Sequence, residues 1–152
     1  MDYHFAFSSD GKIPDGAKPN GREGDGTPLW IARSSVLSDP SHLGGIHPGK
    51  VRPAFGAALI PLSGREVQVA GYEVLMEEGI WERGSGGQIP DGAIVCGRED
   101  NGEPLFVARA NLSGGLHPGK IRFAFGAAFI GFGGKEVSIS DYEVLVSQNG
   151  LR

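Results

Sequence analysis

The chain has 152 residues, enough for one compact domain or two small, closely joined halves, and with 39% of its residues hydrophobic it can form a core. Its 26 glycines and 10 prolines have no collagen-like period and alternate with aliphatic residues, which indicates a turn-rich globular protein rather than a disordered one. The net charge of −4 and the scattered Lys and Arg exclude the basic surface that binds nucleic acid or an anionic membrane.

Two features of the sequence bear on the cellular compartment in which the protein is expected. The N-terminal residues Met1 to Phe5 lack a basic start followed by a long apolar stretch, so no signal peptide is predicted. Cys96 is the one cysteine and cannot form an intrachain disulfide. Both favour the cytoplasm, with unconventional secretion or display at the cell surface as the alternatives. No apolar run approaches the roughly 20 residues that span a bilayer, so no transmembrane segment is expected.

The chain contains an internal repeat. Residues 13–33 align with residues 89–109 at an offset of 76, and 13 of the 21 positions are identical. Residues 46–75 align with residues 116–145 at an offset of 70, and 18 of the 30 positions are identical. Self-similarity at this level indicates a duplicated structural unit. Positions that both copies keep are therefore under a shared structural or functional constraint.

The two offsets differ by 6 because the first copy has a longer loop around Asp39 and Pro40. We expect two homologous repeats, residues 1–76 and 77–152, that together form one compact unit. Cys96 lies where the first repeat has Asn20, so a catalytic role for this thiol is not expected.

Each repeat is predicted to consist of short strands between glycine-rich turns. The expected strands are 28–33, 51–60 and 66–75 in the first repeat and 104–109, 121–130 and 136–145 in the second, preceded by strands that contain Phe5 and Trp81. Helical periodicity is absent. The predicted fold is all-β: two tandem homologous repeats, with seven or eight short antiparallel strands in total, form two small twisted sheets related by a pseudo-two-fold axis.

The motif Gly-Gly-x-His-Pro-Gly-Lys occurs twice, ending at Lys50 and at Lys120. Its spacing matches a phosphate-binding loop, but Val or Ile follows where Ser or Thr would bind magnesium, and a strand follows instead of a helix. The favoured interpretation is a Pro-Gly turn that displays one lysine. The histidines of the motif, His47 and His117, have no set of partners with metal-ligand spacing, so structural roles are expected for them, and no metal or other cofactor.

A second kept motif, Gly-Arg-Glu, ends at Glu23 and at Glu99. Both acids lie in predicted loops, where functional residues are common. Glu99 precedes Lys120 by 21 residues and Glu23 precedes Lys50 by 27, the difference of 6 being the loop insertion. We expect each acid to converge with its lysine at one strand end, where the carboxylate accepts from sugar hydroxyls and the ammonium donates to one. The alternative is a surface carboxylate paired with the adjacent arginine.

Catalysis by the two acids is not expected. Glycoside hydrolysis requires two carboxyl groups with separated pKa values, whereas residues related by a repeat have similar surroundings. We therefore predict a binding protein with no catalytic residue. The remaining kept residues are assigned structural roles: Arg33, Arg109, Glu73 and Glu143 in ion pairs or on sheet faces, and Tyr72 and Tyr142 in the core with anchored hydroxyls.

These motifs resemble the DM-nine repeat family of lectins. The matching elements, each present twice and in the same order, are Ile-Pro-Asp-Gly-Ala at Ile13 and Ile89, Gly-x-Glu at Gly21 and Gly97, Pro-Leu-aromatic-aliphatic-Ala-Arg at Pro28 and Pro104, His-Pro-Gly-Lys at His47 and His117, Gly-[Arg/Lys]-Glu-Val at Gly64 and Gly134, and Tyr-Glu-Val-Leu at Tyr72 and Tyr142. The match covers nearly the whole chain.

The resemblance implies an all-β lectin of innate immunity that recognises mannose or mannose-rich glycans on microbial surfaces and acts in pattern recognition and agglutination. It implies sugar-binding roles for Glu23, Lys50, Glu99 and Lys120, and two sites in each chain, with more in a homodimer. Some relatives have Asp in place of Glu, or keep the acid in one repeat only. The alternative, favoured by the missing signal peptide, is an intracellular module that binds a protein or a vesicle component and no sugar.

Overall fold

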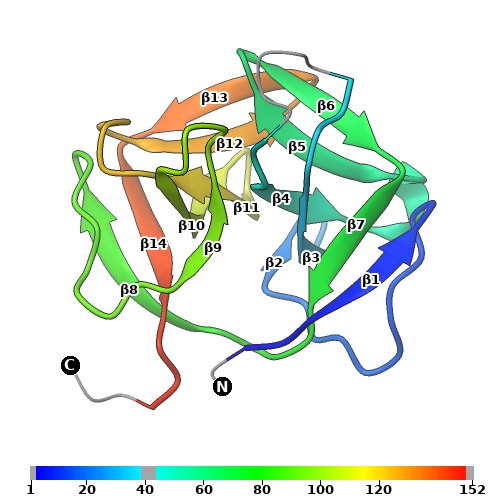
Figure 1. Ribbon diagram of the computed structural model, residues 1–152. Helices are drawn as coiled ribbons and strands as arrows, with labels where there is room; N and C mark the ends of the chain where they lie inside the picture. Colours follow the sequence, from blue (N-terminus) through cyan, green and yellow to red (C-terminus); the bar gives the residue numbers. More distant parts are fainter. Residues whose placement is uncertain (1–2, 39–43, 150–152) are drawn as a thin grey trace.

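The computed structural model describes residues 3–38 and 44–149, and these residues form an all-β fold (Figure 1). The strands are β1 (Phe5–Ser9), β2 (Gly21–Arg22), β3 (Pro28–Ser34), β4 (His47–Val51), β5 (Ala58–Leu62), β6 (Arg65–Val69), β7 (Gly71–Leu75), β8 (Ile80–Ser85), β9 (Val95–Arg98), β10 (Pro104–Leu112), β11 (Gly115–Ile121), β12 (Ala128–Phe132), β13 (Lys135–Ile139) and β14 (Asp141–Val146). One short 3-10 helix, η2, spans Pro53–Phe55. Within these ranges, no helix has the length and apolar character needed to cross a membrane.

The described strands belong to one antiparallel sheet in the order β1-β7-β3-β4-β5-β6-β13-β12-β11-β10-β14-β8, with β2 and β9 off this path. The expectation of separate small sheets is therefore wrong. The strands of residues 5–75 lie on one side of Figure 1 and those of residues 80–146 on the other. They meet where β6 pairs with β13, at Arg65 and Lys135, because the backbone amides of Glu66 and Glu136 donate across this boundary to the carbonyls of Gly134 and Gly64.

Three clusters of buried hydrophobic residues form the core. One lies within the first repeat, around Ile60 and Tyr72, and one within the second, around Ile130 and Tyr142. The third contains residues of both repeats: Tyr3, Ile31, Leu75, Cys96, Val107 and Leu145. Because burial of apolar surface is the main driving force of folding, this shared cluster joins the two halves energetically.

Polar contacts also cross between the halves. Arg33 donates from Nη1 to the carbonyl of Cys96 at 3.1 Å, and Arg109 donates to the carbonyl of Asn20, the matching position, at 2.9 Å. Cys96 itself is 2% exposed, and burial raises the pKa of its thiol to about 12, so it is an inert core residue. Backbone pairing crosses as well, because Arg22 of β2 pairs with Leu116 of β11.

The long strands predicted at 51–60 and 121–130 are not formed. In the first repeat, β4 ends at Val51, η2 follows, and β5 begins at Ala58; in the second, β11 ends at Ile121 and β12 begins at Ala128. Gly56 ends η2 with a left-handed φ of 69°, a conformation that glycine adopts without steric cost. The continuous strand predicted at 66–75 is likewise two strands, β6 and β7.

The His-Pro-Gly-Lys motif is not a turn. His47 to Lys50 lie in β4, between β3 and β5, and all four residues are buried. Gly49 explains how the strand fits, because a Cβ atom there would lie 2.2 Å from the carbonyl oxygen of Leu59. The glycine in this motif therefore provides close approach between two strands rather than a bend.

Other assignments are confirmed. Arg33 Nε donates to Glu73 Oε1 at 2.9 Å, and Arg109 Nε donates to Glu143 Oε1 at the same distance. The tyrosine side chains are buried, and their hydroxyls donate to backbone carbonyls, Tyr72 to Lys12 and Tyr142 to Gln88. The predicted loop insertion around Asp39 and Pro40 lies outside the described residues.

Candidate functional site

The first candidate cluster consists of Glu23, Lys50, Arg52, Glu66 and His117. Glu23 follows β2, Lys50 and Arg52 lie in and just after β4, Glu66 is in β6, and His117 comes from β11 of the other repeat. Lys50 Nζ lies 3.7 Å from Glu66 Oε2, and Arg52 Nε donates to Glu23 Oε2 at 2.9 Å. The fold thus brings the predicted acid and lysine to one place. The carboxylate of Glu23 pairs with Arg52, which lies outside the Gly-Arg-Glu motif.

The second candidate cluster consists of Glu99, Lys120, Arg122, Glu136 and His47. Its contacts match those of the first cluster closely. Lys120 Nζ lies 3.8 Å from Glu136 Oε2, and Arg122 Nε donates to Glu99 Oε2 at 2.8 Å. In both clusters the acid is paired with an arginine two residues after the lysine, not with the adjacent Arg22 or Arg98. The alternative interpretation paired each acid with the adjacent arginine of the Gly-Arg-Glu motif, and that choice of partner is wrong.

Each cluster depends on a histidine from the other repeat. Lys50 Nζ donates to Nδ1 of His117 at 3.0 Å, and Lys120 Nζ donates to Nδ1 of His47 at 3.0 Å. Because an ammonium group can only donate, Nδ1 is the acceptor and the ring proton of a neutral histidine is on Nε2. That nitrogen lies 3.9 Å from Glu23 Oε1 in the first cluster and 3.9 Å from Glu99 Oε1 in the second.

Burial controls the charge of these groups. The side chains of Lys50 and Lys120 are 4% and 3% exposed. Loss of hydration lowers the pKa of Lys50, and lowers that of Lys120 to about 8, although nearby carboxylates act in the opposite direction. Burial and the charge of Lys50 lower the pKa of His117 to about 4, so this histidine is neutral at pH 7. The first cluster therefore presents a neutral ring donor beside its amine.

The first cluster contains polar atoms whose hydrogen-bonding capacity is unused. Within the described ranges, Glu66 Oε2 and His117 Nε2 are buried without a hydrogen-bond partner. The Glu66 side chain is only 7% exposed, and it packs against the backbone of Gly131. Since nearly all buried polar groups in proteins are hydrogen-bonded, two such atoms beside Lys50 make this cluster a candidate site for a polar ligand.

The sequence identified four residues of the two clusters and missed the others. It did not assign Arg52, Arg122, Glu66 or Glu136 to the site, and it gave His47 and His117 structural roles. A signal was present, because all six are identical between the repeats. The strand alternation suggested half-buried sheet positions for the two glutamates, and nothing local revealed which histidine meets which lysine.

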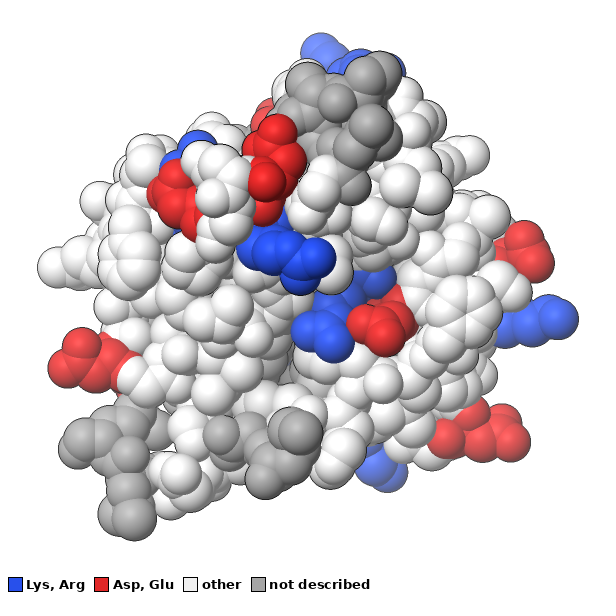
Figure 2. All heavy atoms as spheres, viewed as in Figure 1, with Lys and Arg blue, Asp and Glu red and all other residues white. Residues whose placement is uncertain are grey.

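The second cluster adjoins a pocket. Glu99, Lys120, Arg122 and Glu136 line a pocket of about 350 Å³, together with Leu62, Ser63, Asp100, Asn101, Phe125 and Phe129. The side chains that line this pocket include both cations and carboxylates. On the face shown in Figure 2, Lys and Arg likewise lie beside Asp and Glu, and neither sign covers a continuous area.

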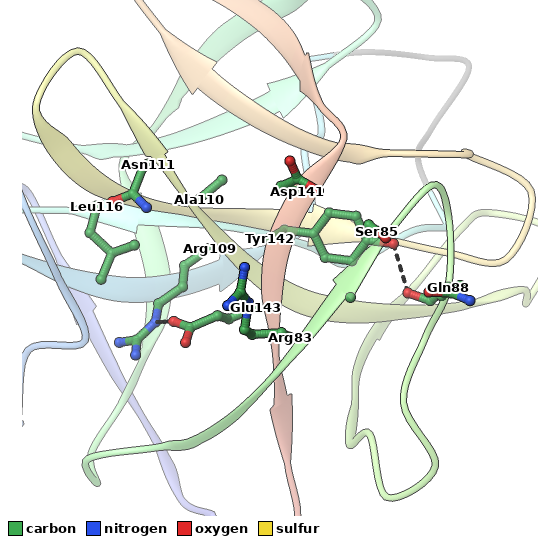
Figure 3. A pocket seen from close by; sticks show the side chains of 11 residues that line it. Arg83, Ser85, Gln88, Arg109, Ala110, Asn111, Leu116, Asp141, Tyr142 and Glu143 are labelled. Carbon is green, nitrogen blue, oxygen red and sulfur yellow. Dashed lines mark hydrogen bonds and ion pairs between the residues drawn. The ribbon is translucent and has the colours of Figure 1, made fainter.

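A further groove of about 550 Å³ lies away from both clusters, over β8, β10 and β14 (Figure 3). Its half-buried guanidinium, Arg109, is already engaged by Glu143, by the carbonyl of Asn20 and by the face of the Trp81 ring. The close-up shows Arg109 and Glu143 pointing toward one another. This groove contains none of the predicted sugar-binding residues. No group of three or more His, Cys, Asp or Glu in the described part of the chain could hold a metal ion.

The fold and the two clusters define an all-β protein with duplicated polar sites. The family model for the DM9 repeat matches residues 40–139, which is 100 of the 152 residues, and the chain belongs to the DM9 repeat family. The match includes Lys50, Glu99 and Lys120. Comparison with curated protein sequences finds no match.

Among solved structures, the nematode sperm cell motility protein MFP2B has a similar fold, with a TM-score of 0.65 and 16% sequence identity. The similarity covers 99% of this chain and 48% of that one, so the chain spans about half the length of MFP2B. At this identity the likeness shows the fold alone.

Proposed function

We propose that this DM9 repeat protein is a lectin that binds mannose or mannose-rich glycans through two sites, one at each cluster, and that it acts without catalysis. On this proposal the repeats, residues 1–76 and 77–152, fold as one pseudo-two-fold unit, since each supplies a histidine to the other's site. Recognition of microbial surfaces and agglutination are the activities that such a protein would perform.

The observation that carries the proposal is the convergence of Glu23 and Lys50 beside the unused hydrogen-bonding atoms of Glu66 and His117. A sugar hydroxyl can accept from His117 Nε2 and donate to Glu23 Oε1, because it has one donor and two acceptor positions. A neighbouring hydroxyl can accept from the Lys50 ammonium and donate to Glu66 Oε2. Hydrogen bonds to charged groups contribute about 1.5–3 kcal/mol each, which is sufficient for a weak monosaccharide site.

The charge of the clusters also favours a neutral polyhydroxylated ligand. Two cations and two carboxylates lie in the first cluster, and His117 is uncharged at pH 7. An anionic ligand such as a phosphate would meet two carboxylates in the same place. A sugar instead uses donors and acceptors together, which this mixed set provides.

Calorimetric titration of D-mannose into the full chain tests the proposal. The parent protein should give saturable heat with two sites per chain, and the Glu23→Gln/Glu99→Gln variant should bind at least tenfold more weakly, because an amide cannot replace the charged acceptor. Glu73→Gln/Glu143→Gln is the matched control, since it removes a pair of kept carboxylates that lies outside the clusters. Circular dichroism must show that every variant is folded.

The alternative is an intracellular protein- or vesicle-interaction module that binds no sugar. It is favoured by the ion pairs of Glu23 with Arg52 and Glu99 with Arg122, which give both acids a structural role. If this alternative holds, the Glu23→Gln/Glu99→Gln variant is destabilised, and the parent protein gives no heat with mannose. A parent protein without a sugar response, or a cluster variant that binds mannose as the parent does, contradicts the lectin proposal.

A further inference from the structure

The two clusters have the same charged residues but different apolar neighbours. Phe129 stands opposite Lys120 in the pairing of β11 with β12, whereas Leu59 stands opposite Lys50 in the pairing of β4 with β5. Phe125 in the second repeat corresponds to Phe55 in the first. Phe132, whose ring centroid lies 5.6 Å from Lys50 Nζ, adjoins the first cluster, whereas the matching Leu62 lines the pocket of the second. The clusters therefore differ in where their aromatic rings lie, and the second has a ring on the strand that pairs with its lysine.

In the second cluster this ring completes a stack. The Phe125 and Phe129 rings are nearly parallel, at 11°, with centroids 4.2 Å apart. Arg122 Cζ lies 4.5 Å from the centroid of the Phe125 ring, so the guanidinium covers Phe125 as well. Both phenylalanines are half-buried and line the pocket that contains Glu99 and Lys120. An apolar surface thus adjoins the polar groups of this site.

The arginine that covers the phenylalanine has more carboxylate partners in the second cluster than in the first. Arg122 donates to both Glu99, at 2.8 Å, and Glu103, at 2.8 Å. In the first repeat Thr27 occupies the position of Glu103, and its hydroxyl donates to Asp25. A guanidinium fixed by two carboxylates keeps Phe125 in place at a lower entropic cost on binding than one fixed by a single carboxylate.

We propose that Phe129, stacked on Phe125, gives the Glu99–Lys120 site an aromatic platform for a sugar ring and makes that site the preferred one for an oligosaccharide. This inference rests on the proposed lectin function. The first site, with Leu59, holds a single sugar through its polar groups. The second adds contact with the ring of the same sugar or of the next residue in the glycan.

Carbohydrate is the ligand class that suits such a platform. A pyranose ring carries hydroxyls around its edge and C–H groups on its faces, so polar and apolar contacts are made at the same time. The electron-rich face of an aromatic ring attracts these polarised C–H groups. The pocket volume of about 350 Å³ is at the lower end of the range of roughly 300–1,000 Å³ for small-ligand sites, which suits one or two sugar residues rather than a longer chain.

The experiment isolates each site in the full-length chain and exchanges the residue that differs. Glu23→Gln leaves the second site intact, and Glu99→Gln leaves the first. Each variant is titrated with D-mannose and with an α-linked mannobiose. The second site should bind the disaccharide about tenfold more tightly than the first, and Phe129→Leu should abolish that difference.

The reciprocal exchange is the matched control. Leu59→Phe in the protein with only the first site should raise its affinity for the disaccharide toward that of the second site. Both residues occur naturally at this position of the fold, so both variants are expected to fold, and circular dichroism checks this. Equal affinity of the two sites, or a Phe129→Leu variant that binds as its parent does, overturns the inference while leaving the lectin proposal intact. Absence of mannose binding at both sites overturns both.

Discussion

At the residue scale, the unusual groups are the buried lysines and the histidines that accept hydrogen bonds from them. A buried ammonium is costly unless its donors are satisfied. Lys50 donates to His117 and lies 3.7 Å from Glu66, and Lys120 donates to His47 and lies 3.8 Å from Glu136. A histidine can serve as the acceptor only while it is neutral, because the protonated ring has no lone pair on Nδ1. Protonation of His117 therefore breaks its contact with Lys50.

The stability of the protein should consequently depend on His117 in acid. Its pKa is about 4 in the folded protein and 6.5 in an unfolded chain, so the unfolded state binds the proton more tightly. The free energy of unfolding is therefore expected to fall as the pH decreases from 6.5 to 4, by up to about 3 kcal/mol from this residue. His117→Asn keeps an acceptor near the Nδ1 position but does not titrate.

Urea unfolding of the parent and His117→Asn proteins at pH 7, 5.5 and 4.5 measures this effect. The variant should have a lower free energy of unfolding at pH 7, because the smaller side chain leaves a cavity, and the gap between the two proteins should narrow as the pH decreases. Parallel pH dependences for the two proteins would show that His117 does not carry the proton linkage.

At the element scale, β4 and β11 are decisive because each contributes to both clusters. Each strand has its lysine in one cluster and, three residues earlier, its histidine in the other. Close approach to the neighbouring strand fixes this position. A Cβ atom on Gly119 would lie 2.2 Å from the carbonyl oxygen of Phe129 and 2.8 Å from Ile130 Cδ1, as the matching atom on Gly49 would from Leu59 and Ile60.

Gly119→Ala should therefore be destabilising by about 2 kcal/mol or more, since an extra methyl group in a packed region forces the backbone to move. If the lectin proposal holds, it should also weaken mannose binding at the second site, because Lys120 is the next residue. Gly71→Ala is the control: its Cβ atom would lie at an ordinary distance of 3.4 Å from the Phe7 ring, and the second repeat has Asp141 there. Chemical denaturation of both variants measures the difference, and equal stabilities would refute the packing argument.

At the scale of the whole molecule, the repeats share a core and exchange side chains. The third hydrophobic cluster draws on both repeats, and the hydroxyl of Tyr3 donates to the carbonyl of Val146 at 2.7 Å. Each arginine of the kept Arg–Glu pairs also donates to a carbonyl of the other half. A single repeat would leave these apolar and polar groups exposed to water.

A fragment of residues 1–76 is accordingly expected not to fold alone. Its backbone amide spectrum should show poor dispersion, and mixing with residues 77–152 should restore dispersion because the shared cluster can then form. The intact chain under the same conditions is the reference. A well-dispersed spectrum from the isolated fragment would mean that the repeats are independent domains and that the shared core contributes little.

Local sequence determines many of the strands of this protein and marks its constrained residues. Alternating apolar residues and glycine-rich turns determine strands such as β3 and β10, and duplication marks Glu23, Lys50 and their counterparts as constrained residues. These features could be predicted because strand propensity, turn chemistry and repetition are properties of neighbouring residues or of the chain compared with itself. The same local reasoning failed at His-Pro-Gly-Lys, where proline and glycine are typical of turns but here lie in a buried strand.

Only the tertiary structure decided which groups meet in the sites. Lys50 and His117 are 67 residues apart, and Lys120 and His47 are 73 apart, so no local pattern could pair them. The burial that makes Glu66 a partner of Lys50, and that lowers the pKa of His117, arises from the packing of one repeat against the other. Sequence determined the strands and the residues under constraint, whereas long-range packing determined their partners, their charge states and the different surroundings of the two lysines.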